Sequence, residues 1–304
     1  MKSDIKNIKA SVRGRLQNKA KETKRPYAEV LQYYAMERFL YRFSQSDYAG
    51  QFILKGALMF IVWNVPARRT TVDIDFLGRI DNKVENIESV VRDVCKIKVL
   101  PDGLVFDAKT VKGQRIKEDA DYEGVRVKFF AFLERSKIPM QIDIGFGDII
   151  IPKPFTIDYP TILDFPAPHL QGYSFESVVA EKFEAMVKLG LLNSRMKDFY
   201  DIWLMTRQMN FDGRKLAAAI KATFENRETP LPAKAPLFAG EIYDEKSHSE
   251  TMWKAFLRRK QIKNGPESLA QAAQSIEVFL SEPVKAITAG KVSSRKWHAP
   301  GPWK

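Results

Sequence analysis

The chain has 304 residues, 45% of them hydrophobic and 28% charged, which is typical of a globular protein and enough for one large domain or two ordinary ones. A formal net charge of +12 favours anionic partners such as nucleic acid or nucleotides. The single cysteine, Cys95, excludes a disulfide framework, and no apolar run approaches the roughly 20 residues of a membrane helix, so we expect a cytoplasmic protein with no membrane partner.

The first 26 residues carry nine Lys or Arg residues and only two acidic ones. Such a segment is either a basic helix that meets phosphates or a solvated, partly ordered arm, and we favour the arm. From Tyr27 to Phe43 the apolar residues recur at helical spacing. This spacing predicts a long amphipathic helix whose aromatic side chains pack in the core.

Residues 52–76, FILKGALMFIVWNVPARRTTVDIDF, are the most informative stretch. In VDIDF the alternation of a strand places Asp73 and Asp75 on one face. Their Cα atoms would lie roughly 6.5 to 7 Å apart, so the two charges repel by about 2.5 kcal/mol at an effective dielectric near 20. A cation is therefore expected, and Mg²⁺ fits because it takes oxygen ligands and shares its shell with substrate phosphates.

The alternative for this pair is two solvated aspartates at a strand edge. The context favours a site. Gly56 supplies a turn whose backbone N–H groups can cradle a phosphate. The basic residues Arg68 and Arg69 lie between that turn and the acids.

Residues 84–97 read as a surface helix, and residues 102–116, 122–134 and 138–148 alternate well enough to form three strands. On the last of these strands Asp143 points away from its apolar neighbours, so it can join the first two carboxylates. The alternative is an acid on an edge strand. We expect Asp148 to cap a turn.

Five prolines between residues 148 and 173 predict a stiff connection, and we place a domain boundary near residue 165. The second half reads as helical. Ser174 is a candidate N-cap for a helix in which Lys182 lies off the apolar stripe, and the next helix carries Asp198 and Asp201 on one face. On their own these residues indicate only solvated surface pairs. The basic C-terminal tail contains Trp297 and Trp303 and either stacks on single-stranded nucleic acid or is disordered, and we favour disorder.

Several motifs together carry a family resemblance. They are RFLYRFSQSDYAGQFILKGALMF, R-x-T-x-x-DIDF, QIDIGFGD, YPTILDFPAP, VVAEKFEAMVKLG and NSRMKDFYDIW. In this order the chain resembles the AbiEii/AbiGii-type nucleotidyltransferase toxins of bacterial toxin-antitoxin and abortive-infection systems. The resemblance spans roughly residues 27 to 280.

The resemblance implies an α+β fold like that of DNA polymerase β: a nucleotidyltransferase domain with a mixed sheet at residues 1–165, then a helical domain at 166–304. It implies that Asp73, Asp75 and, with a looser match, Asp143 hold Mg²⁺ and act in catalysis. It also implies that Lys182 meets the nucleotide phosphates and that Asp198 is an active-site acid. The nucleotide-binding residues would be Lys55, Gly56, Ala57, Arg69 and Lys182. Related enzymes often have Gly-Gly or Gly-Ser where this chain has Gly56-Ala57, which removes a hydroxyl from the turn.

Three functions remain open at this stage. The first is a toxin that transfers a nucleotide from a nucleoside triphosphate to an RNA end, the 3′ end of a tRNA above all, and that a cognate antitoxin neutralises. The second is nucleotidyl transfer to a hydroxyl of a small molecule or a protein. The third is a nucleic-acid-binding protein without turnover, against which the intact pair of aspartates argues.

Overall fold

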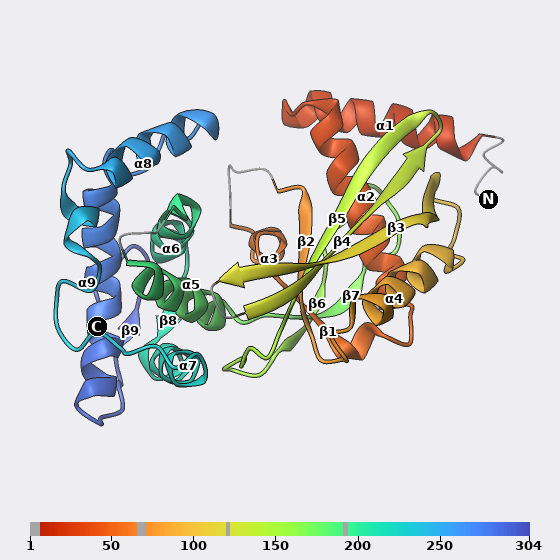
Figure 1. Ribbon diagram of the computed structural model, residues 1–304. Coiled ribbons are helices and arrows are strands. Elements are labelled where there is room, and N and C mark those ends of the chain that lie inside the picture. The colour runs from red at the N-terminus through yellow and green to blue at the C-terminus, as the bar shows by residue number, and fades with distance from the viewer. Residues whose placement is uncertain (1–6, 66–70, 120–121, 191–193) are drawn as a thin grey trace. The chain divides into compact units, whose positions relative to one another are not determined.

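The computed structural model describes residues 7–65, 71–119, 122–190 and 194–304 (Figure 1). The chain forms two compact units. The first draws on the segments Met1–Asn64, Thr70–Gly147 and Phe155–Gly172, and the second mainly on Asp148–Pro154 and Tyr173–Lys304. The predicted boundary near residue 165 falls inside a segment of the first unit, and the assignment of domains stays a prediction.

The first unit is built on a mixed sheet of seven described strands in the order β3-β4-β5-β2-β1-β7-β6. The neighbours β2 and β5 run parallel, as do β1 and β7, whereas the other pairs are antiparallel. The three strands predicted after residue 100 are confirmed as β3, β4 and β5. The strands are β1 (Phe52–Lys55), β2 (Asp73–Gly78), β3 (Leu104–Asp119), β4 (Tyr122–Leu133), β5 (Ser136–Phe146), β6 (Phe155–Asp158) and β7 (His169–Gly172).

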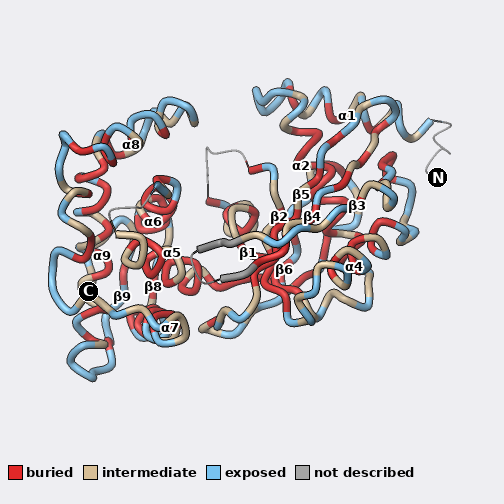
Figure 2. Tube along the Cα trace, viewed as in Figure 1, coloured by how far each residue is buried: buried red, intermediate tan, exposed pale blue. Residues whose placement is uncertain are grey.

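Helices α2 and α4 pack on one face of this sheet, and their apolar stripes form the core with the strands' inward residues. Phe43 of α2 stacks on Phe76 of β2 with ring centroids 4.9 Å apart. Buried residues accordingly run the length of α2 (Figure 2). The described helices of this unit, with a 3-10 turn, are α1 (Ile8–Thr23), α2 (Tyr27–Ser44), η1 (Ala49–Gln51), α3 (Leu58–Val62) and α4 (Val84–Lys96).

The prediction of a solvated N-terminal arm is wrong, because the basic segment forms helix α1. Asn7 caps it by accepting a hydrogen bond from the Ala10 N–H at 3.0 Å. Val12, Leu16 and Ala20, spaced four apart, are buried. These three apolar residues form a narrow stripe along a helix that is otherwise largely charged. The basic composition of the segment therefore gave little indication of a buried face.

A buried ion network fixes α2 to the loop before β3. The Asp102 carboxylate accepts hydrogen bonds from Arg42 at 2.6 and 3.0 Å, from Arg38 at 3.4 Å and from the Leu104 N–H at 3.1 Å. The other side of Arg38 meets Glu37 at 3.1 Å, and all four charged groups are buried. Each of these charged groups is paired with an opposite charge. Removing any one of them leaves its partner as an unpaired charge in the apolar interior.

Replacing Asp102 by alanine should therefore lower the free energy of unfolding by about 3 to 5 kcal/mol, because Arg38 and Arg42 lose their shared acceptor. Urea denaturation of the purified variant measures this loss. The matched control is Asp93→Ala, which breaks an exposed pair with Lys96 at 3.3 Å and should change stability by less than about 1 kcal/mol. Equal losses in the two variants would contradict the role given to the network.

The second unit is mainly helical. Ser174 caps α5 by accepting a hydrogen bond from the Ser177 N–H at 3.2 Å, as predicted. Short strands β8 and β9 pair beside the helices, a feature that the all-helical expectation omitted. The elements are α5 (Phe175–Leu189), α6 (Met196–Gln208), β8 (Phe211–Asp212), α7 (Gly213–Asn226), η3 (Gly240–Tyr243), α8 (His248–Arg259), α9 (Leu269–Thr288) and β9 (Lys296–Trp297).

One smaller expectation about this unit is wrong. The C-terminal tail is packed: the Trp297 and Trp303 indole N–H groups donate to the carbonyls of Thr206 and Phe279, each at 2.8 Å. Trp297 is buried, which removes it as a stacking platform for bases. Asp148 accepts hydrogen bonds from Arg227 at 2.8 and 3.2 Å, and its role as a turn cap stays a prediction.

The mixed sheet with its flanking helices, followed by a helical region, confirms the predicted α+β fold. Among the described helices, none combines the length and apolarity that crossing a bilayer demands.

Candidate active site

A single row of charged residues crosses the centre of the sheet. In the strand register Lys55 of β1 lies opposite Asp75 of β2, Asp75 lies opposite Asp143 of β5, and Asp143 lies opposite Arg126 of β4. Residues directly opposite each other on neighbouring strands share a face and have Cβ atoms roughly 5 Å apart. The row therefore sets two carboxylates side by side between two basic residues.

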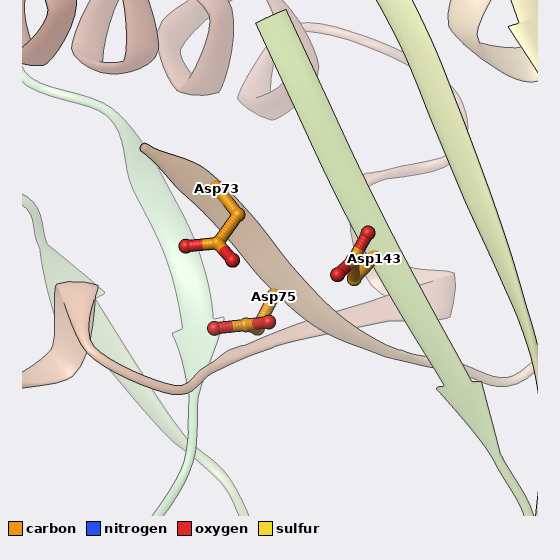
Figure 3. Close-up of side chains that lie close together, drawn as sticks. All are labelled: Asp73, Asp75 and Asp143. Atoms are coloured by element: carbon orange, nitrogen blue, oxygen red, sulfur yellow. The ribbon is translucent and has the colours of Figure 1, made fainter. Parts of the chain in front are cut away.

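Asp73 completes the acidic group. It lies two residues before Asp75 on β2 and therefore on the same face of that strand. One carboxylate oxygen from each of Asp73, Asp75 and Asp143 lies within 4.8 Å of the others. Figure 3 shows the three side chains directed toward a common region from two adjacent strands. The prediction that Asp143 can join the first two carboxylates matches this geometry, and because β5 lies between β2 and β4 Asp143 is not on an edge strand.

Repulsion makes this arrangement unfavourable without cations. Two unit charges 5 Å apart repel by about 3 kcal/mol at an effective dielectric near 20. Three hard carboxylate donors on rigid strands are the ligand type that Mg²⁺ and Mn²⁺ prefer. The donor set thus fits a divalent metal, and Asp73 and Asp75 are half-buried, so an ion can reach them from solvent.

Gly56 is required beside the acids for two reasons. Its φ is +72°, a left-handed backbone conformation that residues other than glycine rarely adopt. A Cβ at this position would lie 2.6 Å from the Asp75 Cγ and 2.8 Å from its Cβ. The backbone turn between β1 and α3 therefore touches the Asp75 carboxylate, which places the backbone of the turn and the acidic group in one small region.

Arg126 is the residue that the sequence reasoning missed. Its Nε and Nη2 donate to the two oxygens of Asp143 at 2.8 and 2.7 Å, a bidentate pair. Gln141 donates to the same carboxylate at 3.3 Å, and the hydroxyl of Thr71 donates to Asp73. The alternation of VRVKFF puts Arg126 on the outward face, but only the strand register reveals that Asp143 is its partner.

The electrostatics of Arg126 reflect the whole acidic group. Hydrogen bonding to Asp143 raises the pKa of its guanidinium, and the charges of Asp73 and Asp75 act in the same direction. The guanidinium thus keeps its charge and holds the Asp143 carboxylate in a fixed orientation. This bidentate pairing uses one lone pair on each oxygen, and Gln141 uses the second lone pair on Oδ2, so Oδ1 keeps a lone pair that a metal ion could take.

The second unit contains the other predicted group. Lys182 Nζ donates to Asp198 and lies 3.0 Å from Asp201 Oδ2, while Arg195 Nε lies 2.8 Å from Asp198. Burial would raise the pKa of Asp198, but Lys182, Arg195 and Lys197 outweigh burial and lower the pKa to about 2. The interpretation of these residues as exposed surface pairs is wrong, because both aspartates are buried.

The remaining predicted residues lie as follows. Lys55 is buried at the end of β1, and Ala57 directly precedes α3. Arg69 lies outside the described residues. The structure brings Asp73, Asp75, Asp143, Lys55 and Gly56 together, whereas Lys182 and Asp198 belong to the second unit, and their part in the same site stays a prediction.

Comparison with known families agrees with this geometry. Residues 38–275 match the family model described as nucleotidyl transferase AbiEii toxin, type IV TA system. The chain belongs to this family. It is therefore a nucleotidyltransferase of a toxin family from toxin-antitoxin systems, and the resemblance noted from its motifs is confirmed.

Comparisons with solved structures and with curated proteins give less information about this chain than the family match does. The chain is similar to JHP933 from Helicobacter pylori at 14% identity, covering 83% of this chain and 93% of that one with a TM-score of 0.41. It is similar at 13% identity to a candidate nucleotidyltransferase from H. pylori, covering 84% and 95% with a TM-score of 0.41. No curated protein matched the chain. The family assignment rests on the sequence match alone.

Gly56→Ala should reduce nucleotidyl transfer at least tenfold, because the added methyl group displaces the Asp75 carboxylate and the left-handed turn becomes strained by about 1 to 2 kcal/mol. Initial rates with a labelled nucleoside triphosphate measure the effect. Gly50→Ala is the control, since a Cβ there meets nothing within 4 Å and its φ is not positive. Wild-type rates for Gly56→Ala would show that the close contact has no function.

Proposed function

We propose that this toxin-family enzyme is a magnesium-dependent nucleotidyltransferase that transfers a nucleoside monophosphate from a nucleoside triphosphate to the 3′ end of an RNA, with tRNA as the preferred acceptor. The observation that supports the proposal most strongly is the group of three carboxylates, with ligand atoms within 4.8 Å, beside the Gly56 turn. The family match supplies the reaction class, and the carboxylates supply ligands for the metal ions that the reaction would use.

Asp73 and Asp75 would hold the metal ions, and Asp143 would complete the site. Two ions bound in such sites polarise the attacking hydroxyl and neutralise the leaving pyrophosphate. The pairing of Asp143 with Arg126 prevents its carboxylate from rotating away, and Thr71 does the same for Asp73. The chain thus fixes the ligands before substrate binds, which avoids reorganisation during the reaction.

The chemical step exchanges a phosphoanhydride bond of the triphosphate for a phosphodiester bond to the acceptor. The acceptor hydroxyl oxygen forms a bond to the α-phosphorus, and the bond from that phosphorus to the bridging oxygen breaks, so that pyrophosphate leaves with the electron pair. The hydroxyl proton passes to Asp143, our candidate general base, whose Oδ1 keeps a lone pair that neither Arg126 nor Gln141 uses. Phosphoryl transfer requires the attacking and leaving oxygens to lie roughly in line, and metal ions held by the carboxylates of β2 and β5 would orient them.

The triphosphate requires compensating positive charge. We assign this role to Lys55, to the backbone N–H groups at Gly56 and Ala57, and to Arg69 and Lys182. Asp198 would orient Lys182, as its contact with Nζ suggests. This assignment makes the helical second domain a contributor to the site.

The acceptor and the partner follow from charge and family. A net charge of +12 favours RNA over an uncharged small molecule, because each phosphate contact releases counterions. Membership of a toxin family further supports a cognate antitoxin encoded with this chain. A nucleotide substrate, an RNA acceptor and the lack of a disulfide framework are consistent with action in the cytoplasm.

Asp75→Ala should lower transfer at least about 100-fold, since loss of a metal ligand removes several kcal/mol of transition-state stabilisation. The assay incubates protein with each α-labelled nucleoside triphosphate, Mg²⁺ and total bacterial RNA and resolves the products on a gel. Asp93→Ala is the control, because Asp93 lies on the exposed side of α4. Label in a tRNA-sized band only with active protein supports the proposal; label in no RNA with all four nucleotides contradicts the RNA acceptor.

Lys182→Arg separates a catalytic role from a structural one. Arginine keeps the positive charge that Asp198 and Asp201 need, so the melting temperature should stay near that of the wild type. The bulkier guanidinium moves the charge away from a phosphate that a compact ammonium would contact, so kcat/KM for the triphosphate should fall at least about tenfold. An unchanged kcat/KM would show that Lys182 serves the fold alone.

A further inference from the structure

The sheet face that presents Asp73, Asp75 and Asp143 also carries a second group of side chains, which the acidic site does not use. Along β4 the residues Val125, Val127, Phe129, Ala131 and Leu133 are buried against the helices. The alternate positions, which include Lys128, Phe130 and Phe132, therefore point to the opposite, outward face.

The strand register shows what lies beside them. Lys128 lies opposite Lys112 of β3 and Gln141 of β5, and Phe132 lies opposite Val105 of β3 and Lys137 of β5. Lys137 Nζ is 3.7 Å from the centroid of the Phe130 ring, a cation-π contact. We name this surface the basic-aromatic patch: Val105, Lys112, Lys128, Phe130, Phe132 and Lys137.

The patch is exposed and positively charged. Lys112, Lys128 and Lys137 are exposed, Val105 is 52% exposed, and both phenylalanines are half-buried. No described acidic side chain forms a salt bridge with any of the three lysines. One acidic residue, Asp107, lies opposite Phe130, but it forms a salt bridge with none of these lysines. Its carboxylate accepts a hydrogen bond from the Lys109 backbone N–H at 3.0 Å.

The patch is continuous with the carboxylates. Lys128, Gln141 and Asp73 lie in one row of the register, and the next row contains Arg126, Asp143 and Asp75. Successive rows on one face are separated by two residues, or roughly 6.5 to 7 Å. From the row of Asp143 to the row of Phe132 and Lys137 the distance is about 20 Å. A chain lying along the patch thus leads directly to the metal ligands.

Rings on an open sheet face with lysines between them suit single-stranded nucleic acid better than an acidic protein. Each base has a π-face that stacks on an aromatic side chain, and the phosphates between bases meet the lysines. RNA-recognition sheets bind bases through aromatic residues exposed on strands in the same manner. An acidic protein would match the charges but would leave Phe130 and Phe132 without a specific role.

We propose that the basic-aromatic patch binds the single-stranded 3′ end of the acceptor RNA, with bases stacked on Phe130 and Phe132 and phosphates facing Lys112, Lys128 and Lys137. The inference rests on the proposed function for the identity of the acceptor. The patch holds the strand along β4 and β5 so that its terminal hydroxyl arrives beside Asp75 and Asp143. Sequence preference for the acceptor end would then arise from stacking on these rings.

The test measures RNA binding without turnover. A short fluorescein-labelled single-stranded RNA with a free 3′ hydroxyl is titrated with the full chain, with no nucleoside triphosphate present, and anisotropy gives Kd. The double variant Phe130→Ala/Phe132→Ala should weaken binding at least tenfold, because each lost stack is a substantial part of the affinity. Lys128→Gln should weaken binding and reduce the slope of log Kd against log salt by about 0.7 to 1.

Matched controls lie elsewhere on the same unit. Phe155→Ala removes a phenylalanine that is 40% exposed on β6, at the far end of the strand order, and Lys98→Gln removes an exposed lysine after α4. Both controls should bind RNA like the wild type. Because Lys128 is exposed, its variant should keep the wild-type melting temperature, which separates lost binding from lost folding.

The outcomes discriminate between the two proposals. Weaker RNA binding in the patch variants but not in the controls supports the patch, and it does so even if no RNA accepts a nucleotide, a result that would contradict the transfer proposal alone. Unchanged RNA affinity in the patch variants overturns the inference and leaves an acidic protein as the occupant. Equal losses in patch and control variants also overturn it.

Discussion

The parallel pairing of β2 with β5 is the constraint on which the site depends. It sets Asp75 directly opposite Asp143, with Asp73 one row away, so that carboxylates which repel each other are held on two rigid strands. Lys55 and Arg126 flank them in the same row and reduce the cost of that repulsion. The surplus of negative charge that remains at the centre is what a divalent cation and a triphosphate would complete.

The rest of the first unit keeps these strands in register. Inward residues of β2, β4 and β5 pack with α2 and α4, while the Asp102 network holds α2 to the loop before β3. A slip of one residue in β2 or β5 would turn the carboxylates of that strand into the core and its apolar side chains into solvent, so the hydrophobic pattern strongly favours the register that forms the site. Gly56 adds a special backbone position at the site, because only glycine fits between the turn and Asp75.

Local patterns in the sequence predicted much of this and failed where the answer depends on tertiary contacts. Alternation and helical spacing predicted the long strands, α2 and the N-cap at Ser174, since these signals lie within a few neighbouring residues. Arg126 was missed because its role depends on the β4–β5 register. The buried state of Asp198 and Asp201 was missed because Lys182, their partner, lies on a different helix. For α1 and the Trp297 tail, charge and terminal position suggested disorder, whereas a few buried side chains determine the outcome.

The most direct test of the central claim is crystallographic. Crystals of the protein with Mn²⁺ and a non-hydrolysable nucleoside triphosphate would be measured at the manganese absorption edge. We predict anomalous peaks coordinated by Asp73 and Asp75, with Asp143 at the same site and, if two ions bind, a separation of about 3.5 to 4 Å. Bound nucleotide with no manganese at these carboxylates would contradict the account.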